Sequence, residues 1–207
     1  MSQFFQIHPD NPQARLIGQA VTIIRAGGVI AYPTDSAYAL GCQLGDKAAL
    51  ERIRRIRKLD DTHNFTLVCR DLSELGTYAR VNNSVFRLIR NHTPGPYTFI
   101  LKATDEVPRR LLHPKRRTIG LRVPENRIAL ALLEALGEPL MSVTLMLPGD
   151  ELPMTDPEEI RERLQHDLDL VIDGGICGPE PTTVIDLADD TPVLVRQGRG
   201  DVAPFGV

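Results

Sequence analysis

Apolar residues recur at helical spacing in several segments of this chain, and residues that favour helix ends lie beside those segments. The first segment predicts a helix that begins at the pair Asn11-Pro12 and stops at the glycines 27–28. Asp46 and Asp156 are candidate caps of later helices. The spacing predicts further helices over residues 46–58, 72–77, 84–91, 128–136 and from 156 onward.

Short apolar runs bounded by turn residues separate these helices and predict strands. They cover residues 29–32, 65–69, 97–101, 118–123, 139–147, 170–172, 183–187 and 193–196. Because helices and strands alternate, the sequence predicts one α/β domain over residues 1–207 with a mixed sheet. The apolar runs are far shorter than the about 18–20 residues that cross a bilayer. The first residues resemble no secretion signal, so we expect a cytoplasmic protein without a membrane partner.

The composition narrows the class of protein further. Of the 207 residues, 42% are hydrophobic and 25% are charged, which excludes a disordered tail, a collagen-like fibre and a basic nucleic-acid peptide. The three cysteines are far apart and form no cluster with histidine, so we expect neither a disulfide framework nor a metal site. The sequence lacks the motifs of dinucleotide dehydrogenases, P-loop ATPases, serine hydrolases and zinc proteases.

The formal net charge of −3 conceals an uneven distribution of charged residues along the chain. Between Glu51 and Arg127 there are 17 Lys and Arg against 8 Asp and Glu, a balance of +9. The flanks carry the other 7 basic and 19 acidic residues, a balance of −12. A basic stretch of this kind favours a polyanionic ligand, unless its residues are scattered over the surface or paired with the acidic flanks.

Two polar segments have residue types that suit a ligand, one after a predicted strand and one on and after a predicted helix. Residues 32–41 put three hydroxyl groups and a carboxylate just past a strand, where ligands bind in open α/β sheets; the alternative is a polar turn that caps the next element. Residues 52–63 carry five Arg or Lys and then His63, which suits a polyphosphate; the alternative is a solvated helix face.

Three later segments are weaker signals when each is taken alone. Residues 93–98 form a rigid Pro-Gly-Pro turn that leads into a strand. Thr182 precedes a strand, where a structural cap is the simpler interpretation, and Arg196 lies between a strand and a glycine.

Taken together and in order, these segments resemble the YrdC/YciO family of threonylcarbamoyl-adenylate synthases. The resemblance runs from about residue 14 to residue 200 and rests on the blocks at 33–41, 94–98, 122–124, 182–186 and 196–198. The sequences of the first block and of residues 144–149 are most similar to those of the YciO-type branch.

The resemblance implies a YrdC-like fold, a twisted mixed parallel and antiparallel sheet flanked by helices with an open basic cleft. It also implies an activity linked to tRNA modification, in which ATP with Mg²⁺, L-threonine and bicarbonate give threonylcarbamoyl-AMP and pyrophosphate. By family position, the residues facing the nucleotide are Arg55, Arg57, His63, Thr144 and Arg196, of which Arg55, Arg57 and Thr144 are the catalytic candidates. Those around L-threonine are Thr34, Ser36, Tyr38, Arg122 and Thr182, and Arg122 is a natural partner for its carboxylate.

Two blocks depart from the pattern of the dedicated synthases. The phosphate-binding Lys-x-Arg becomes Arg55-Ile56-Arg57, with two extra residues before its last basic position. The Ser-Ala-Asn block becomes Thr144-Leu145-Met146, in which Met146 cannot replace an amide. Two alternatives remain open, namely a synthase-like enzyme of reduced activity and a protein that binds double-stranded RNA or tRNA. The second would use the basic helix at residues 52–58 together with Arg109, Arg110, Lys115, Arg116 and Arg117.

Overall fold

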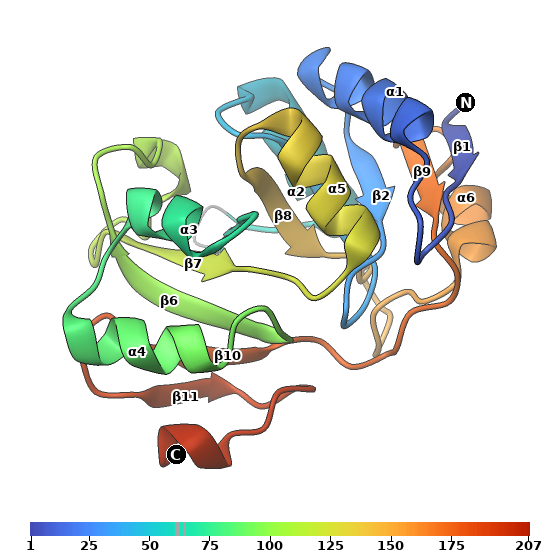
Figure 1. Cartoon of the computed structure of the whole chain (residues 1–207). Coiled ribbons are helices and arrows are strands. Elements are labelled where there is room, and N and C mark those ends of the chain that lie inside the picture. Colours follow the sequence, from blue (N-terminus) through green and yellow to red (C-terminus); the bar gives the residue numbers. More distant parts are fainter. Residues whose placement is uncertain (61–62, 64) are drawn as a thin grey trace.

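The computed structural model describes residues 1–60, 63 and 65–207, and within them eleven strands form one sheet (Figure 1). In chain order the strands are β1 (Gln3–Gln6), β2 (Ile30–Tyr32), β3 (Ala39–Gln43), β4 (Thr66–Val68), β5 (Ala79–Arg80), β6 (Tyr97–Ala103), β7 (Thr118–Arg122), β8 (Leu140–Thr144), β9 (Leu170–Asp173), β10 (Thr183–Asp186) and β11 (Val193–Arg196). Across the sheet they run β1-β9-β2-β3-β8-β4-β7-β6-β10-β11, and β5 pairs with β6 beside this path.

The sheet is mixed, as the sequence predicts. The pairs β1–β9, β9–β2, β4–β7 and β6–β10 are parallel, and the other pairs of the described sheet are antiparallel. The helices that flank it are α1 (Ala14–Arg25), α2 (Lys47–Arg57), α3 (Leu72–Tyr78), α4 (Asn83–Asn91), α5 (Arg127–Leu136) and α6 (Pro157–Leu164), with short 3-10 turns η1 (Arg109–Leu111) and η2 (Ala203–Phe205). None of the helices in the described ranges is long and apolar enough to span a membrane.

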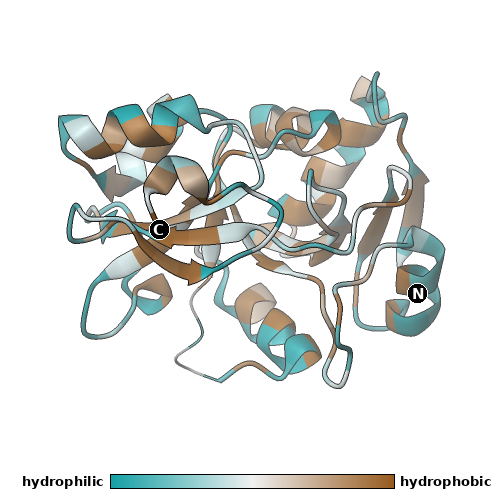
Figure 2. Cartoon of the chain, turned by 90° about the horizontal axis from the view of Figure 1, so that it is seen from below, coloured by the Kyte–Doolittle hydropathy of each residue, from teal (hydrophilic) through white to brown (hydrophobic). Residues whose placement is uncertain are grey.

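Alternation along the strands divides the core into two parts. Ile30 and Tyr32 of β2 pack with the neighbouring helices α1 and α5, whereas Ala31 between them faces the larger core on the other side. In β9, Leu170 and Ile172 likewise belong to the part under α1 and α5, and Val171 belongs to the larger core. Because both faces of these central strands are covered, their sequences are continuously apolar rather than alternating. Figure 2 shows this as brown strands inside and teal outer turns of the helices.

Helix α2 begins where the sequence predicts, because the side chain of Asp46 accepts a hydrogen bond from the Ala49 amide at 3.0 Å. The predicted start of the first helix at Asn11-Pro12 is wrong, since α1 begins only at Ala14. The imidazole Nδ1 of His8 accepts the Asn11 amide at 3.2 Å, so these residues belong to a turn before the helix.

Replacing Asp46 with alanine is expected to lower the free energy of unfolding by about 1 kcal/mol, because the first turn of α2 loses its side-chain acceptor. Asp46→Asn keeps an acceptor and should stay within a few tenths of a kcal/mol of the wild type. Urea denaturation of both variants measures the difference. Equal losses in the two variants would contradict a capping role.

Candidate active site

A cavity of about 440 Å³ opens over strands β4, β6, β7, β8 and β10. Its floor includes a row of residues paired across four neighbouring strands, Ile100, Gly120, Thr66 and Ser142. A Cβ at Gly120 would lie 2.9 Å from the Thr66 hydroxyl, so the absence of a side chain at Gly120 leaves space above the sheet. By register the row lies on the sheet face that α1 and α5 cover elsewhere, and the cavity occupies the part of that face beyond them.

The polar turn after β2 forms one wall of the cavity, and within it Thr34 and Ser36 have different roles. The Thr34 hydroxyl donates to the Ala37 carbonyl at 2.6 Å and accepts the Ser36 amide at 3.1 Å. Both side chains are buried; the hydroxyl of Thr34 fixes the turn, whereas Ser36 also lines the cavity. The segment forms a polar turn that also borders the cavity, and the strand β3 that follows it was not predicted.

Tyr38 lines the cavity, but its hydroxyl is engaged elsewhere. It donates to the Gly175 carbonyl at 2.9 Å and accepts the Gly174 amide at 3.3 Å. Burial raises the pKa of this phenol, so the group stays neutral. The structure thus makes Tyr38 an anchor for the loop after β9, and the expected contact of its hydroxyl with a substrate is not available in this arrangement.

Arg122, at the end of β7, is the most enclosed cation of the cavity. Its Nη2 donates to the carboxylate of Asp35 and, at 3.2 Å, to the hydroxyl of Ser36. The side chains of Arg122 and Asp35 are only 8% and 10% exposed. Burial lowers the pKa of Arg122 to about 10, so the guanidinium remains charged at neutral pH. This end of the cavity therefore contains a buried ion pair.

Arg57, His63 and Arg196 also line the cavity. Arg57 is half-buried and Arg196 is exposed, and partial desolvation lowers the pKa of each guanidinium. Arg196 donates to the Thr182 carbonyl at 3.0 Å, which holds it across the end of β10. The Thr182 hydroxyl lies 3.0 Å from that of Thr98, a cavity residue that sequence reasoning passed over within the Pro-Gly-Pro block.

The structure places Arg55 outside this cluster. α2 continues to Arg57, and residues two apart on a helix do not share a face. Arg55 is therefore exposed, while Arg54 lies over the Phe65 ring at 5.6 Å on the side of the cavity. The interpretation of Arg55 and Arg57 as a pair of phosphate ligands does not fit this geometry.

The remaining wall comes from the chain after β8. Thr144 and Met146 line the cavity together with residues 151–153 of the following loop. Leu152 in that loop is 61% exposed, which is unusual for a large apolar side chain. Sequence reasoning did not identify this loop, because it carries no motif. Within the described ranges no three His, Cys, Asp or Glu side chains gather as a candidate metal site.

His63 is expected to make stability depend on pH. Burial, followed by the nearby charge of Arg57, lowers its pKa below the ordinary 6.5, so the folded protein resists protonation. As the pH falls below 6.5, the unfolded chain takes up a proton that the folded chain does not, and stability decreases. Between pH 7 and pH 5 the free energy of unfolding, measured in urea, should therefore fall less for His63→Gln than for the wild type. The same dependence on pH in both proteins would contradict the shifted pKa.

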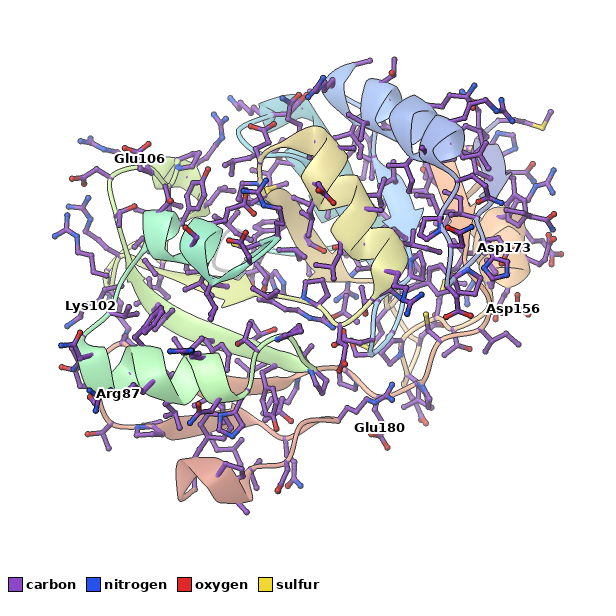
Figure 3. All side chains as sticks on the ribbon, in the orientation of Figure 1. Arg87, Lys102, Glu106, Asp156, Asp173 and Glu180 are labelled. Atoms are coloured by element: carbon purple, nitrogen blue, oxygen red, sulfur yellow. The ribbon has the colours of Figure 1, made fainter. Side chains whose placement is uncertain are left out.

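The basic excess of the middle segment is not separated from the acidic flanks in space. Arg52 pairs with Asp169 at 2.8 Å, and Arg116 contacts both Asp186 and Asp189, all three acids belonging to the C-terminal flank. Figure 3 shows the acidic Glu106 on the same side of the molecule as Arg87 and Lys102, and Lys102 pairs with Asp189 at 3.4 Å. These pairs weaken the basis for RNA binding, which remains a prediction that its salt dependence would test.

Comparison with known proteins gives the family. A model named Sua5/YciO/YrdC and described as "Telomere recombination" matches residues 22–198. The chain belongs to this family. It is 69% identical to the "Uncharacterized protein YciO" of Escherichia coli K12, over 99% of this chain and 100% of that protein. The crystal structure of E. coli YciO superposes with a TM-score of 0.96 over 99% of this chain and 100% of the other. The expected YciO-type membership and YrdC-like fold are therefore confirmed.

More distant members of the Sua5/YciO/YrdC family have names that refer to a reaction or a ligand. The threonylcarbamoyl-AMP synthase of Nitrosococcus oceani is 34% identical over 156 residues, which is 75% of this chain and 83% of that protein. The structure of P. abyssi Sua5 complexed with L-threonine is 26% identical, with a TM-score of 0.87 over 95% of this chain and 58% of the other.

Proposed function

We propose that this protein binds ATP and L-threonine in the cavity over β4, β6, β7, β8 and β10 and joins them with bicarbonate. The convergence of Arg57, Arg122 and Arg196 in one cavity carries the proposal, because these three cations come from three separate elements. A cavity of about 440 Å³ is within the usual range for small-molecule sites. The names of the N. oceani and P. abyssi relatives point to the same ligands.

The reaction begins with the α-amine of L-threonine and bicarbonate, which form a carbamate and release water. A carbamate oxygen then attacks the α-phosphorus of ATP, the bond from that phosphorus to the bridging oxygen breaks, and pyrophosphate leaves. The products are threonylcarbamoyl-AMP, pyrophosphate and water, and Mg²⁺ enters with ATP as part of the substrate. No covalent nucleophile from the protein is required.

The side chains of the cavity have separate tasks in this scheme. Arg122 holds the carboxylate of L-threonine, with the hydroxyl of Ser36 beside it, and Thr182, which Arg196 contacts, contributes a second hydroxyl to the amino-acid site. Arg57 and Arg196 stabilise the negative charge that grows on the departing pyrophosphate, the largest contribution in phosphoryl-transfer reactions of this type. His63 is neutral near pH 7 and serves as a hydrogen-bond donor to a phosphate oxygen rather than as a cation.

We expect the turnover to be slow. Met146 lines the cavity beside Thr144, at the place where the resemblance to dedicated synthases implies an amide. A thioether offers only a weak acceptor and no donor, so the nucleotide loses hydrogen bonds there. The product is an activated acyl donor, and we propose tRNA modification as the process that consumes it.

The decisive experiment combines synthesis with binding. Radiolabelled L-threonine, bicarbonate and MgATP should give an acid-labile adenylate and stoichiometric pyrophosphate, and omission of bicarbonate should abolish both. Calorimetric titration with ATP, alone and with L-threonine, measures occupancy of the cavity independently of turnover. Absence of product at high protein concentration together with absence of heat for either ligand would refute the proposal.

A further inference from the structure

Asp35 is held in place by two other segments of the chain. Its carboxylate accepts the Arg122 guanidinium and, at 3.0 Å, the backbone amide of Glu125. Its backbone carbonyl accepts the guanidinium of Arg199 at 2.6 Å. A carboxylate that is buried and bonded in this way has little freedom to rotate away from Arg122.

The Asp35 carboxylate changes what Arg122 can offer to a ligand. Nη2 of Arg122 is committed to Asp35 and Ser36, whereas its buried Nε has no hydrogen-bond partner among the described residues. Arg122 also lines the cavity, and neither its Nε nor its Nη1 has a hydrogen-bond partner among the described residues, so the N–H groups of both nitrogens remain for a ligand. The pair Asp35–Arg122 is neutral as a whole, which leaves room for one negative charge beside it but disfavours several.

Arg57 and Arg196 differ from Arg122 in this respect. Arg196 donates to the neutral carbonyl of Thr182, and the described residues supply no carboxylate that is bonded to Arg57 or Arg196. The Nε of Arg57 is buried without a hydrogen-bond partner in the described part of the chain. These two cations therefore present charge that no acidic side chain of the described structure neutralises directly.

We propose that Asp35 determines specificity by charge: beside it, Arg122 accepts a monoanionic carboxylate and rejects phosphate, which is left to Arg57 and Arg196. Asp35 acts through Arg122 and is a positioning residue, not a catalytic one. That the two ligands are L-threonine and ATP rests on the proposed function. The discrimination between a carboxylate and a polyphosphate does not depend on it. The physical reason is that repulsion from the fixed Asp35 charge grows with the charge of the ligand.

The test is a titration observed at the arginine side chains of the full chain. Protein labelled with ¹⁵N-arginine shows one Nε–H signal for each arginine, and the variants R57K, R122K and R196K identify the three signals of the cavity. The probes are inorganic pyrophosphate and L-threonine. In the wild type, pyrophosphate should move the signals of Arg57 and Arg196 but not that of Arg122, and L-threonine should move the signal of Arg122.

Removal of the Asp35 charge should allow Arg122 to bind phosphate. In D35N, pyrophosphate should also move the Arg122 signal, with an affinity there at least about tenfold tighter than in the wild type. It should then compete with L-threonine, and D35E should restore the separation. The matched control is D105N, which removes the exposed partner of Arg117 and should leave all three responses unchanged.

The outcomes separate this inference from the proposed function. Movement of the Arg122 signal by pyrophosphate in the wild type, or an identical response of D35N and the wild type, overturns the inference even where L-threonine and ATP bind. Failure of L-threonine to move any signal, while pyrophosphate responds as expected in both proteins, refutes the choice of amino acid and leaves the sorting by charge supported. If D35N does not fold, the wild-type titration alone still decides.

Discussion

Replacing Arg122 with leucine is expected to lower the free energy of unfolding by about 3–5 kcal/mol, because it leaves the carboxylate of Asp35 buried without its cation. The Glu125 amide still donates to that carboxylate but cannot neutralise it. Urea denaturation at pH 7 measures the loss, and the unchanged slope of the transition would show that both proteins unfold as a single unit.

The double variant Asp35→Leu with Arg122→Leu tests the cause of this loss. A buried pair replaced by apolar side chains is often neutral for stability, so the double variant should regain most of what Arg122→Leu loses. If the double variant is as unstable as the single one, the loss arises from packing around Arg122 rather than from the unpaired charge of Asp35.

Replacing Arg57 with alanine is expected to lower the rate of adenylate synthesis by about 100-fold or more, because one cation that stabilises the departing pyrophosphate is lost. Replacing Arg55 with alanine should change that rate by less than about twofold, since Arg55 is exposed and does not line the cavity. The two variants remove the same charge from the same helix, so the comparison isolates the direction of the side chain.

Initial rates of pyrophosphate release at saturating L-threonine measure both variants, and calorimetric titration of ATP shows whether the loss lies in binding. A larger effect of Arg55→Ala than of Arg57→Ala would contradict the site described above and favour the order of residues that the family resemblance implies. If both substitutions change the rate equally and only slightly, the phosphates would be assigned to Arg196 and His63 alone.

Much of the secondary structure could be predicted because its causes are local. The side chain of Asp46 caps α2 through an amide three residues away, and the glycines 27–28 stop α1 close to where the pattern predicts. β3 could not be predicted in this way. Its residues follow a polar turn, and they form a strand because β2 and β8 supply partners on both sides. Strand formation there depends on residues about 100 positions later in the chain.

Part of the candidate site could likewise be predicted from the sequence, and part could not. Ordered motifs in the sequence were enough to select Ser36, Arg57, Arg122, Thr144 and Arg196, and the fold brings all of them to one cavity. The sequence did not reveal that the hydroxyls of Thr34 and Tyr38 would bind backbone groups instead of facing a ligand. The partners of the Tyr38 hydroxyl lie 136 and 137 positions away, so the packing of distant segments sets them. The partners of Thr34 are local, but the turn motif alone did not distinguish its hydroxyl from that of Ser36.

The sequence by itself determined the α/β class, the mixed sheet, the caps of several helices and the family, because these depend on periodicity, local hydrogen bonds and ordered motifs. Only the tertiary structure decided where the charges act. The balance of +9 in the middle of the chain is partly cancelled by acids of the flanks, such as Asp169 on Arg52 and Asp186 on Arg116. Electrostatic interactions fall with distance in space and not with separation along the chain. For that reason Asp35, 87 residues from Arg122 in sequence, controls the charge that Arg122 presents to the cavity.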